Sequence, residues 1–254
     1  MKALLLDVPL KTAHVTSLPT PTTAPPSHLL LHTSHIGLNP VDALYTFHPL
    51  APPSSPPRII GSDFSATVLS GPLPRGTLVA GFLQGAASSN PLPGAFAEYI
   101  TAESDLVWRV PEGVSPAQAA GVSLCGLTAA QMVFWRLGVP APFGYVPRGE
   151  NKERLPGTWD GSREVVTVFV YGASTSVGMY AAQLVRKGFE AAGVRVRLVG
   201  AASKARWGLL KGGTYGYDEL VDYREEGWVE NVRGWTEGGG GWILRWIACR
   251  RGRR

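Results

Sequence analysis

Cysteine is nearly absent from this 254-residue chain, which contains only Cys125 and Cys249. Two cysteines are too few for a disulfide framework or for a four-cysteine zinc site. Cys125 lies in an apolar run, so we expect it to be a small buried hydrophobic residue. The sequence therefore indicates neither a disulfide-stapled scaffold nor a structural zinc protein.

Long apolar runs are also missing. No stretch approaches the ~20 consecutive apolar residues that a membrane-spanning helix needs. Asp7 interrupts the apolar N-terminal run well before it reaches the length of a secretory signal. We therefore expect a cytoplasmic protein with no membrane partner. The hydrophobic fraction of 44% and the charged fraction of 17% are typical of a globular chain with a substantial core.

The chain also lacks an evenly distributed positive charge. Five arginines in the last ten residues account for the whole net charge of +5, so the rest of the chain is neutral. A broad phosphate-binding face is therefore not indicated, and we expect no nucleic-acid partner. An arginine-rich tail can bind nucleic acid or direct targeting, but a solvated end is the simpler interpretation.

Two textures divide the sequence. Residues 1–137 are rich in proline, glycine and short β-type runs, which predicts a largely antiparallel β-domain. Ser115 and Pro116 favour the start of a helix, and residues 128–137 form a second helical stretch, so residues 115–137 lead to the next domain. The strands predicted in the first part are 2–7, 29–36, 77–82 and 97–101.

The second part alternates strands with helices. Residues 138–164 have no periodicity and are interpreted as an exposed loop insertion. In residues 165–241, strand–helix alternation implies right-handed crossovers and a parallel sheet, so the fold class is α/β. Residues 242–254 are an atypical basic tail, whose start could pair as a further strand. The predicted strands are 165–171, 194–199 and 219–223, and the helices are 176–188, 203–211 and 228–235.

The turn after the first parallel strand predicts a dinucleotide site. A pyrophosphate needs backbone N–H groups, small side chains and the positive end of a helix. Gly172 permits a tight turn, the hydroxyls of Ser174 and Thr175 can donate to phosphate, and Gly178 allows close helix packing. Because Ser174 replaces the middle glycine of G-x-G-x-x-G, a purely structural turn is the alternative. The predicted cofactor-binding residues are Gly172, Ala173, Ser174, Thr175, Ser176, Val177 and Gly178, whose amides should form a positively polarised cradle.

Residues after the second parallel strand favour NADPH over NADH. An NAD site usually offers an aspartate or glutamate there. This chain instead has Ser203, Lys204 and Arg206, which would complement a 2′-phosphate. The alternative is a set of solvated charges that open a helix, although a lysine opposes the helix dipole there.

Five segments stand out along the chain: Gly37-Leu-Asn-Pro-Val-Asp42, Gly61-Ser-Asp-Phe-Ser-Ala-Thr-Val68, Gly94-Ala-Phe-Ala-Glu-Tyr99, Leu124-Cys-Gly-Leu-Thr-Ala-Ala130 and Val170-Tyr-Gly-Ala-Ser-Thr-Ser-Val-Gly178. Together they resemble the zinc-independent medium-chain dehydrogenase/reductase family. Their order and spacing match over residues 1 to about 237, and they are most similar to fungal trans-acting enoyl reductases of polyketide biosynthesis, with quinone oxidoreductases next. The resemblance implies a GroES-like, mainly β catalytic domain (1–137) joined to an incomplete Rossmann dinucleotide-binding domain (165–241), with the active site between them.

The resemblance also implies roles for residues of the first domain. Asn39 and Pro40 would lie near the nicotinamide, and Thr128 would border the nicotinamide or the substrate. Tyr45 is a conceivable proton donor, because a tyrosine hydroxyl can protonate an enolate carbon, but a packed aromatic role is favoured. We expect Asp42 to keep a structural hydrogen bond. The candidate catalytic residues are Asn39, Thr128 and, in its less favoured role, Tyr45.

No metal site is expected. Zinc alcohol dehydrogenases carry a cysteine in the segment that contains Asn39 and a His-Glu pair in the segment that contains Ser62 and Asp63. His28 and His32 fall on an extended run together with a third histidine at position 35. Alternation would place the first two on one face and the third on the other, which does not form a cluster.

The implied reaction is hydride transfer from NADPH to an activated C=C bond, followed by protonation of the α-carbon. The expected partners are a carrier-bound or small-molecule enoyl substrate and a polyketide synthase, and the expected state is a monomer or a homodimer. One alternative is a quinone or enone reductase for small free substrates. Another is a non-catalytic remnant that acts at most as a binding module.

The C-terminal end departs from the family pattern. Family members continue well beyond residue 254 and build six parallel strands, whereas this chain has sequence for about four. The pattern therefore predicts an incomplete sheet and a truncated C-terminus.

Overall fold

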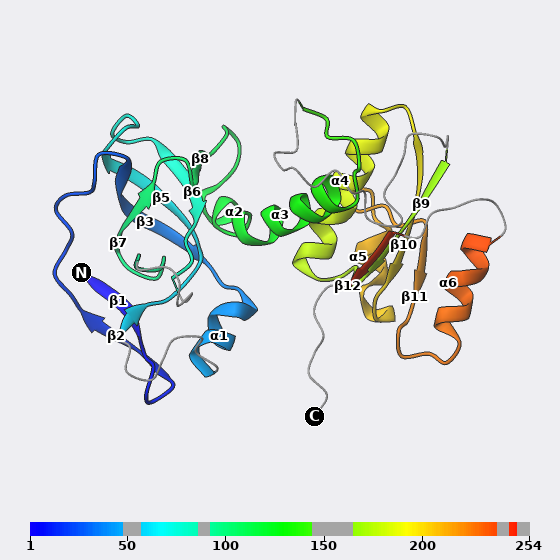
Figure 1. The fold of residues 1–254 in the computed structure, drawn as a ribbon, viewed down its shortest axis with the longest axis horizontal. Coiled ribbons are helices and arrows are strands. Elements are labelled where there is room, and N and C mark those ends of the chain that lie inside the picture. Colours follow the sequence, from blue (N-terminus) through cyan, green and yellow to red (C-terminus); the bar gives the residue numbers. More distant parts are fainter. Residues whose placement is uncertain (48–56, 86–91, 144–164, 238–243, 248–254) are drawn as a thin grey trace. The chain divides into compact units, whose positions relative to one another are not determined.

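The computed structural model of this chain describes residues 1–47, 57–85, 92–143, 165–237 and 244–247 (Figure 1). The chain forms two compact units, Met1–Leu124 and Cys125–Arg254. The division inferred from sequence texture stays a prediction. Most of its loop insertion (144–164) and most of its basic tail (242–243 and 248–254) lie outside the described residues.

The first unit consists mainly of antiparallel sheets, as the sequence predicted. The sheet of five strands has the order β7-β3-β5-β6-β8, and the sheet of three has the order β2-β1-β4. The four predicted strands are confirmed to within two residues at each end. The bounds are β1 (Lys2–Asp7), β2 (Thr12–Ser17), β3 (His28–Gly37), β4 (Arg58–Ile59), β5 (Asp63–Ser70), β6 (Leu78–Phe82), β7 (Tyr99–Glu103) and β8 (Val107–Arg109).

Helices α1 and α2 accompany these sheets. Helix α1 (Pro40–Phe47) follows β3 directly, because Pro40 cannot continue a strand but suits a first helical turn. Helix α2 (Pro116–Ala120) begins as predicted at Ser115. The Ser115 hydroxyl accepts the amide hydrogen of Gln118 at 3.2 Å, and the Gln118 side chain accepts that of Ser115 at 3.0 Å. This reciprocal capping box explains why the chain turns helical there.

Helix α3 (Ser123–Ala130) begins five residues before the predicted helix and continues as a π-helix, η1 (Gln131–Arg136). Its sequence, SLCGLTAA, is small and apolar almost all round, so it shows no clear helical period. Cys125 is buried, as expected. The side chain of Asp63 accepts the Leu124 amide hydrogen at 2.8 Å and so satisfies one N–H group of the first turn.

The second unit contains a parallel sheet of four strands with the order β11-β10-β9-β12. This confirms the predicted strand–helix alternation, and a short 3-10 helix, η2, precedes α5. The segment predicted to add a strand does so over four residues. The bounds are β9 (Val165–Tyr171), α4 (Ser176–Ala191), β10 (Arg195–Ala201), η2 (Lys204–Arg206), α5 (Trp207–Lys211), β11 (Glu219–Val221), α6 (Trp228–Glu237) and β12 (Leu244–Ile247).

Both faces of this sheet carry apolar residues that pack against helices. Val168 belongs to a core that includes Val185 of α4 and Leu210 of α5. Phe169, the next residue of β9, belongs to a second core with Val232 of α6. Because successive side chains of a strand point to opposite faces, α6 covers the face opposite to α4 and α5. Burial on both faces explains the continuous apolar run of β9.

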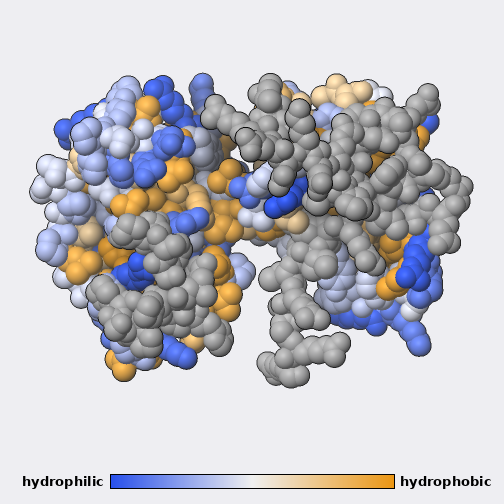
Figure 2. Space-filling model, viewed as in Figure 1, coloured by the Kyte–Doolittle hydropathy of each residue, from blue (hydrophilic) through white to orange (hydrophobic). Residues whose placement is uncertain are grey.

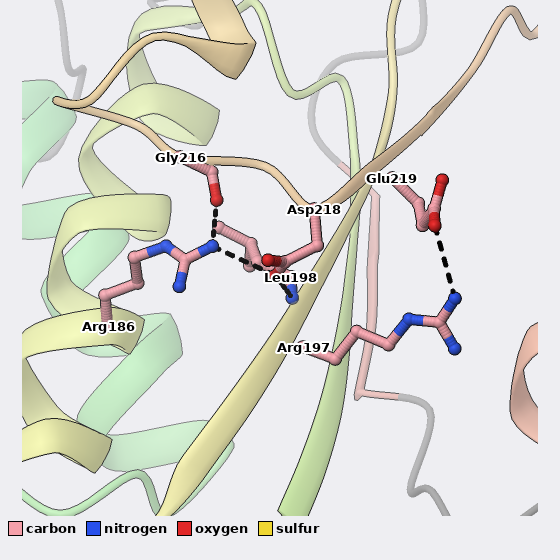
Figure 3. A network of polar contacts seen from close by, with 6 residues as sticks. All are labelled: Arg186, Arg197, Leu198, Gly216, Asp218 and Glu219. Atoms are coloured by element: carbon pink, nitrogen blue, oxygen red, sulfur yellow. Dashed lines mark hydrogen bonds and ion pairs between the residues drawn. The ribbon is translucent and has the colours of Figure 1, made fainter.

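A network of hydrogen bonds and ion pairs stabilises the amino end of β11 (Figure 3). Arg186 of α4 donates to Asp218 at 3.0 Å, and the same carboxylate oxygen accepts the Leu198 amide hydrogen at 2.6 Å. This ties helix, loop and strand together at the end opposite to the glycine turn, so we assign the network a structural role. Its members are Arg186, Arg197, Leu198, Gly216, Asp218 and Glu219.

Candidate functional site

The carboxyl ends of three parallel strands meet at one edge of the second unit's sheet. Ala201 of β10 pairs with Tyr171 of β9 on one side and with Val221 of β11 on the other. The three strands therefore end in register. The glycine turn after β9 and the segments that follow β10 and β11 all leave the sheet at this edge, which is where ligands bind in open parallel sheets.

The glycine turn has the geometry that the sequence predicted. Gly172 has a φ of 81°, a conformation that favours glycine, and its amide donates to the Ala201 carbonyl at 3.2 Å. A Cβ atom on Gly178 would lie 2.4 Å from the Gly172 carbonyl oxygen, so only glycine allows the helix to approach so closely. These observations confirm the conformational argument, whereas cofactor contact stays a prediction.

The predicted role of the Thr175 hydroxyl as a phosphate donor is wrong in this geometry. The hydroxyl donates to the Gly172 carbonyl at 2.8 Å and accepts the Gly178 amide hydrogen at 3.1 Å. Thr175 is therefore the N-cap of α4, and its only hydroxyl hydrogen is already used. The sequence showed a small polar residue here but not the direction of its hydroxyl.

The predicted cradle of amides is also narrower than expected. The amides of residues 172, 173, 175 and 178 all donate within the turn or to β10. Among the described residues, the amides of Ser174, Ser176 and Val177 have no hydrogen-bond acceptor. They stand at the amino end of a 16-residue helix, where the helix dipole favours an anion. The turn therefore fits a phosphate group.

The predicted 2′-phosphate residues lie in the segment that follows β10. Ser203 precedes η2, and its side chain makes no capping hydrogen bond. Arg206 is exposed, whereas the Lys204 ammonium forms an ion pair with Glu225. The sequence has no carboxylate directly after β10, and Glu225 was not predicted to lie here because it comes from the segment that follows the neighbouring strand, β11.

Asp222 is a second acidic residue at this edge that was not predicted from the sequence. Its carboxylate accepts the amide hydrogens of Lys204 at 3.1 Å and Arg224 at 3.0 Å. These backbone hydrogen bonds, first that from Arg224, lower the pKa of Asp222 below its ordinary value. Only the pairing of β10 with β11 brings these residues together. No local motif could have shown it.

In the first unit, Asn39 belongs to a buried polar cluster. Its side-chain amide donates to Asp63 at 3.0 Å, and its backbone amide donates to Asp42 at 2.9 Å. The second Asp42 oxygen accepts from the Ser62 hydroxyl at 3.0 Å. Asp42 thus keeps the structural hydrogen bonds that were expected of it.

Burial governs the acidity of both carboxyl groups. Desolvation raises the pKa of Asp63 to about 6, against the opposing hydrogen bonds from Asn39 and Leu124. Desolvation also raises the pKa of Asp42, and the hydrogen bonds from Asn39 and Ser62 oppose it. The two carboxyl groups therefore hold protons more tightly than exposed aspartates do.

The other predicted residues of the first domain are placed as follows. Pro40 is the first residue of α1, and Tyr45 is in the same helix, with a side chain outside the described part of the structure. Thr128 is half-buried on α3 and belongs to the second unit. Asn39 and Pro40 are thus adjacent at the start of α1.

Two irregularities interrupt the strand that carries the histidines, between Leu30 and Leu31 and between Thr33 and His35. The strict alternation assumed from the sequence does not hold across them. His28 lies 3.9 Å from Glu103. Within the described ranges, no group of three or more His, Cys, Asp or Glu residues could hold a metal ion. No described helix is long and apolar enough to cross a membrane.

Apolar side chains are exposed beside Asn39. Leu38 is 81% exposed, and Leu44 and Phe47 of α1 are also exposed. Hydrophobic patches interrupt the hydrophilic surface on the visible face of the molecule (Figure 2). The neighbourhood of Asn39 thus offers apolar surface that the described residues leave open to solvent.

Comparison with known proteins gives consistent relatives. No protein-family model matches the chain. The chain is 30% identical to the trans-enoyl reductase traG of Penicillium crustosum over 236 residues, which cover 90% of this chain and 58% of that protein. It is similarly 30% identical over 225 residues to the enoyl reductase cheB of Chaetomium globosum, of which it covers 53%. The chain thus spans little more than half the length of these relatives.

A solved structure of a mycobacterial protein complexed with NADPH is 26% identical to the chain, with a TM-score of 0.63. The match covers 94% of this chain and 63% of that one. The quinone oxidoreductase from Coxiella burnetii matches with a TM-score of 0.66 at 23% identity. This match covers 91% of the present chain and 65% of the Coxiella chain, and it shows that the two proteins have the same fold.

Proposed function

We propose that this chain is a member of the medium-chain dehydrogenase/reductase family and works as an NADPH-dependent enoyl reductase on polyketide-type enoyl thioesters. The observation that carries the proposal is the glycine turn at the start of α4. Three amides there, those of Ser174, Ser176 and Val177, have no acceptor in the described structure and stand at the positive end of a long helix.

Different residues at the sheet edge would bind different parts of the cofactor. The amides of Ser174, Ser176 and Val177 would bind the pyrophosphate, while Gly172 and Gly178 keep side chains out of its way. Ser203, Lys204 and Arg206 would hold the 2′-phosphate. When bound, NADPH supplies the hydride for the β-carbon of the activated alkene.

Residues of the first unit would orient the reacting groups. Asn39 and Pro40 are proposed to contact the nicotinamide, and Thr128, which belongs to the second unit, is proposed to border the nicotinamide or the substrate. Asp63 holds the side-chain amide of Asn39 at 3.0 Å, so the group has one orientation rather than many. The exposed side chains of Leu38 and Phe47 support an apolar acyl substrate.

Tyr45 is proposed to pack as an aromatic side chain, with donation of the α-carbon proton as the alternative. Replacing Tyr45 by phenylalanine removes the hydroxyl and keeps the ring. If Tyr45 donates the proton, the rate of enoyl reduction falls while NADPH affinity stays unchanged. An unchanged rate assigns Tyr45 to packing and leaves the rest of the proposal intact.

The test of the proposed function is a nucleotide titration followed by an activity assay. The ring centroid of Trp207 lies 6.0 Å from the Lys204 ammonium nitrogen, so quenching of tryptophan fluorescence should report NADPH binding. The Kd for NADPH should be micromolar. NADPH absorbance should then decay on addition of a short enoyl thioester. If NADPH produces no saturable change, the chain is a remnant without cofactor function and the proposal fails.

A quinone or enone reductase is the second candidate, because the fold also matches a quinone oxidoreductase. Both candidates predict NADPH binding, so the substrate decides between them. Faster NADPH consumption with a small benzoquinone than with the enoyl thioester would favour the second. The polyketide synthase partner and the choice between monomer and homodimer stay predictions.

A further inference from the structure

Two segments that are far apart in sequence run side by side at the carboxyl edge of the second unit's sheet. The Ala202 amide donates to the Val221 carbonyl at 2.9 Å, which continues the pairing of β10 with β11 beyond the strands. Asp222 then accepts the Lys204 amide hydrogen at 3.1 Å. These bonds fix the start of η2 against the segment that contains Glu225.

The side chains of Lys204 and Glu225 meet across these two segments. The ammonium and the carboxylate form an ion pair, and the hydrogen bond and charge of Glu225 raise the pKa of Lys204 above its ordinary value. Both side chains remain largely in solvent, with 60% and 52% exposed. A pair that water reaches so freely opens at little cost.

We infer that Glu225 is a built-in competitor for the 2′-phosphate of the cofactor and sets how strongly the chain prefers NADPH to NADH. The inference rests on the proposed function. In the free protein, the Glu225 carboxylate forms an ion pair with the Lys204 ammonium. An adenosine 2′-phosphate would need to bind the same ammonium. The phosphate must displace that carboxylate, so part of its attraction to Lys204 is lost on binding.

The neighbouring acidic groups do not share this role. Both carboxylate oxygens of Asp222 are already bonded to backbone amides, those of Lys204 and Arg224. The charge of Asp222 also contributes to the raised pKa of Lys204, but in the described structure only Glu225 forms an ion pair with that ammonium. Glu226 is exposed and makes no ion pair in the described structure. It has the same charge as Glu225 one residue further along the chain, which makes it a matched control.

The experiment measures the Kd of adenosine 2′,5′-bisphosphate and of 5′-AMP, which lacks the 2′-phosphate, by titration calorimetry. Glu225→Gln should tighten binding of the bisphosphate by about two- to five-fold, as expected for release of an exposed ion pair, and leave 5′-AMP unchanged. Glu226→Gln should have a clearly smaller effect. In a chain that also carries Lys204→Gln, the Glu225→Gln effect should vanish.

The outcomes separate this inference from the proposed function. If the unaltered chain binds the bisphosphate but Glu225→Gln and Glu226→Gln change its Kd equally, the charge acts only at long range and Glu225 is no competitor. Weaker binding in Glu225→Gln would also overturn the inference. If the unaltered chain binds neither nucleotide, the proposed function itself fails, and the inference fails with it.

Discussion

At the scale of single residues, the close contact at Gly178 gives the sharpest prediction. Gly178→Ala places a methyl group 2.4 Å from the Gly172 carbonyl oxygen, which is backbone and cannot step aside. The free energy of unfolding should fall by about 1–3 kcal/mol, and NADPH affinity should fall as the turn opens. Chemical denaturation and nucleotide titration measure the two effects.

Gly208 of α5 provides the control for this substitution. A Cβ atom there meets nothing within 4 Å, so Gly208→Ala should be neutral or stabilise the chain by up to about 1 kcal/mol. Equal losses in the two variants would show that Gly178 has no special packing role.

Asp63 gives a prediction for the dependence of stability on pH. Burial raises its pKa from 3.8 to about 6, so between these values the folded state holds the proton more tightly than the unfolded state. Its contribution to stability is therefore greatest below pH ~4 and declines as pH rises to about 6. The decline is on the order of 2–3 kcal/mol, and no further change is expected above that range.

The measurement compares unfolding free energies of the unaltered chain and Asp63→Asn across this pH range. Their difference reports the titration of Asp63 together with its coupling to Asp42, whose charge helps to raise the pKa of Asp63. The groups that do not interact with Asp63 cancel. The unaltered chain should lose stability relative to the variant as pH rises from 4 to 6. A difference that stays flat, or that changes in the opposite direction, would contradict the burial argument.

At the scale of elements, the N-cap of α4 supports both the helix and the phosphate turn. Thr175→Val keeps the shape of the side chain but removes the hydroxyl that bridges Gly172 and Gly178. The loss of stability should be about 1 kcal/mol, within the usual range for an N-cap. Thr175→Ser keeps the hydroxyl and should retain most of the stability, as thermal unfolding of both variants will show. Equal melting temperatures for the two would refute the capping role.

Periodicity and turn chemistry predicted most elements of this chain because their signals are local. Strand β9 was predicted to the residue, since a continuous β-branched run indicates burial on both faces. Helix α3 was placed too late, because small apolar residues on all sides leave no period to follow. Strand β11 ends two residues early, at the point where Asp222 turns to bond backbone amides.

The part of the candidate site that depends on glycine conformation could be predicted from the sequence. Gly172 and Gly178 were placed correctly because their conformational requirements follow from sequence position. The cap formed by Thr175 and the competition by Glu225 were not, because they depend on hydroxyl direction and on strand pairing. The hydroxyl direction is fixed by the folded turn, and the contact of Glu225 with Lys204 joins segments that are separated in the sequence. Neither can be read from a local sequence pattern.

At the scale of the whole molecule, the two units differ in what they bring to the proposed reaction. The second unit holds the sheet edge where Ser174, Lys204 and their neighbours would bind phosphates. The first unit holds Asn39 and Pro40, which would meet the nicotinamide. A ligand that contains only the phosphate and adenosine part of the cofactor should therefore affect only the second unit.

Hydrogen exchange read by mass spectrometry tests this division. The amides of Ser174, Ser176 and Val177 have no acceptor in the described structure, so they should exchange quickly in the free protein and slow down when a phosphate accepts from them. Adenosine 2′,5′-bisphosphate should slow exchange in residues 202–206 as well and leave residues 37–42 unchanged, whereas NADPH should also protect residues 37–42. If NADPH leaves residues 37–42 unchanged, Asn39 and Pro40 do not meet the nicotinamide, although the phosphate site would stand. If the bisphosphate protects residues 37–42 as strongly as NADPH does, the two units respond as one, and the division of roles is wrong.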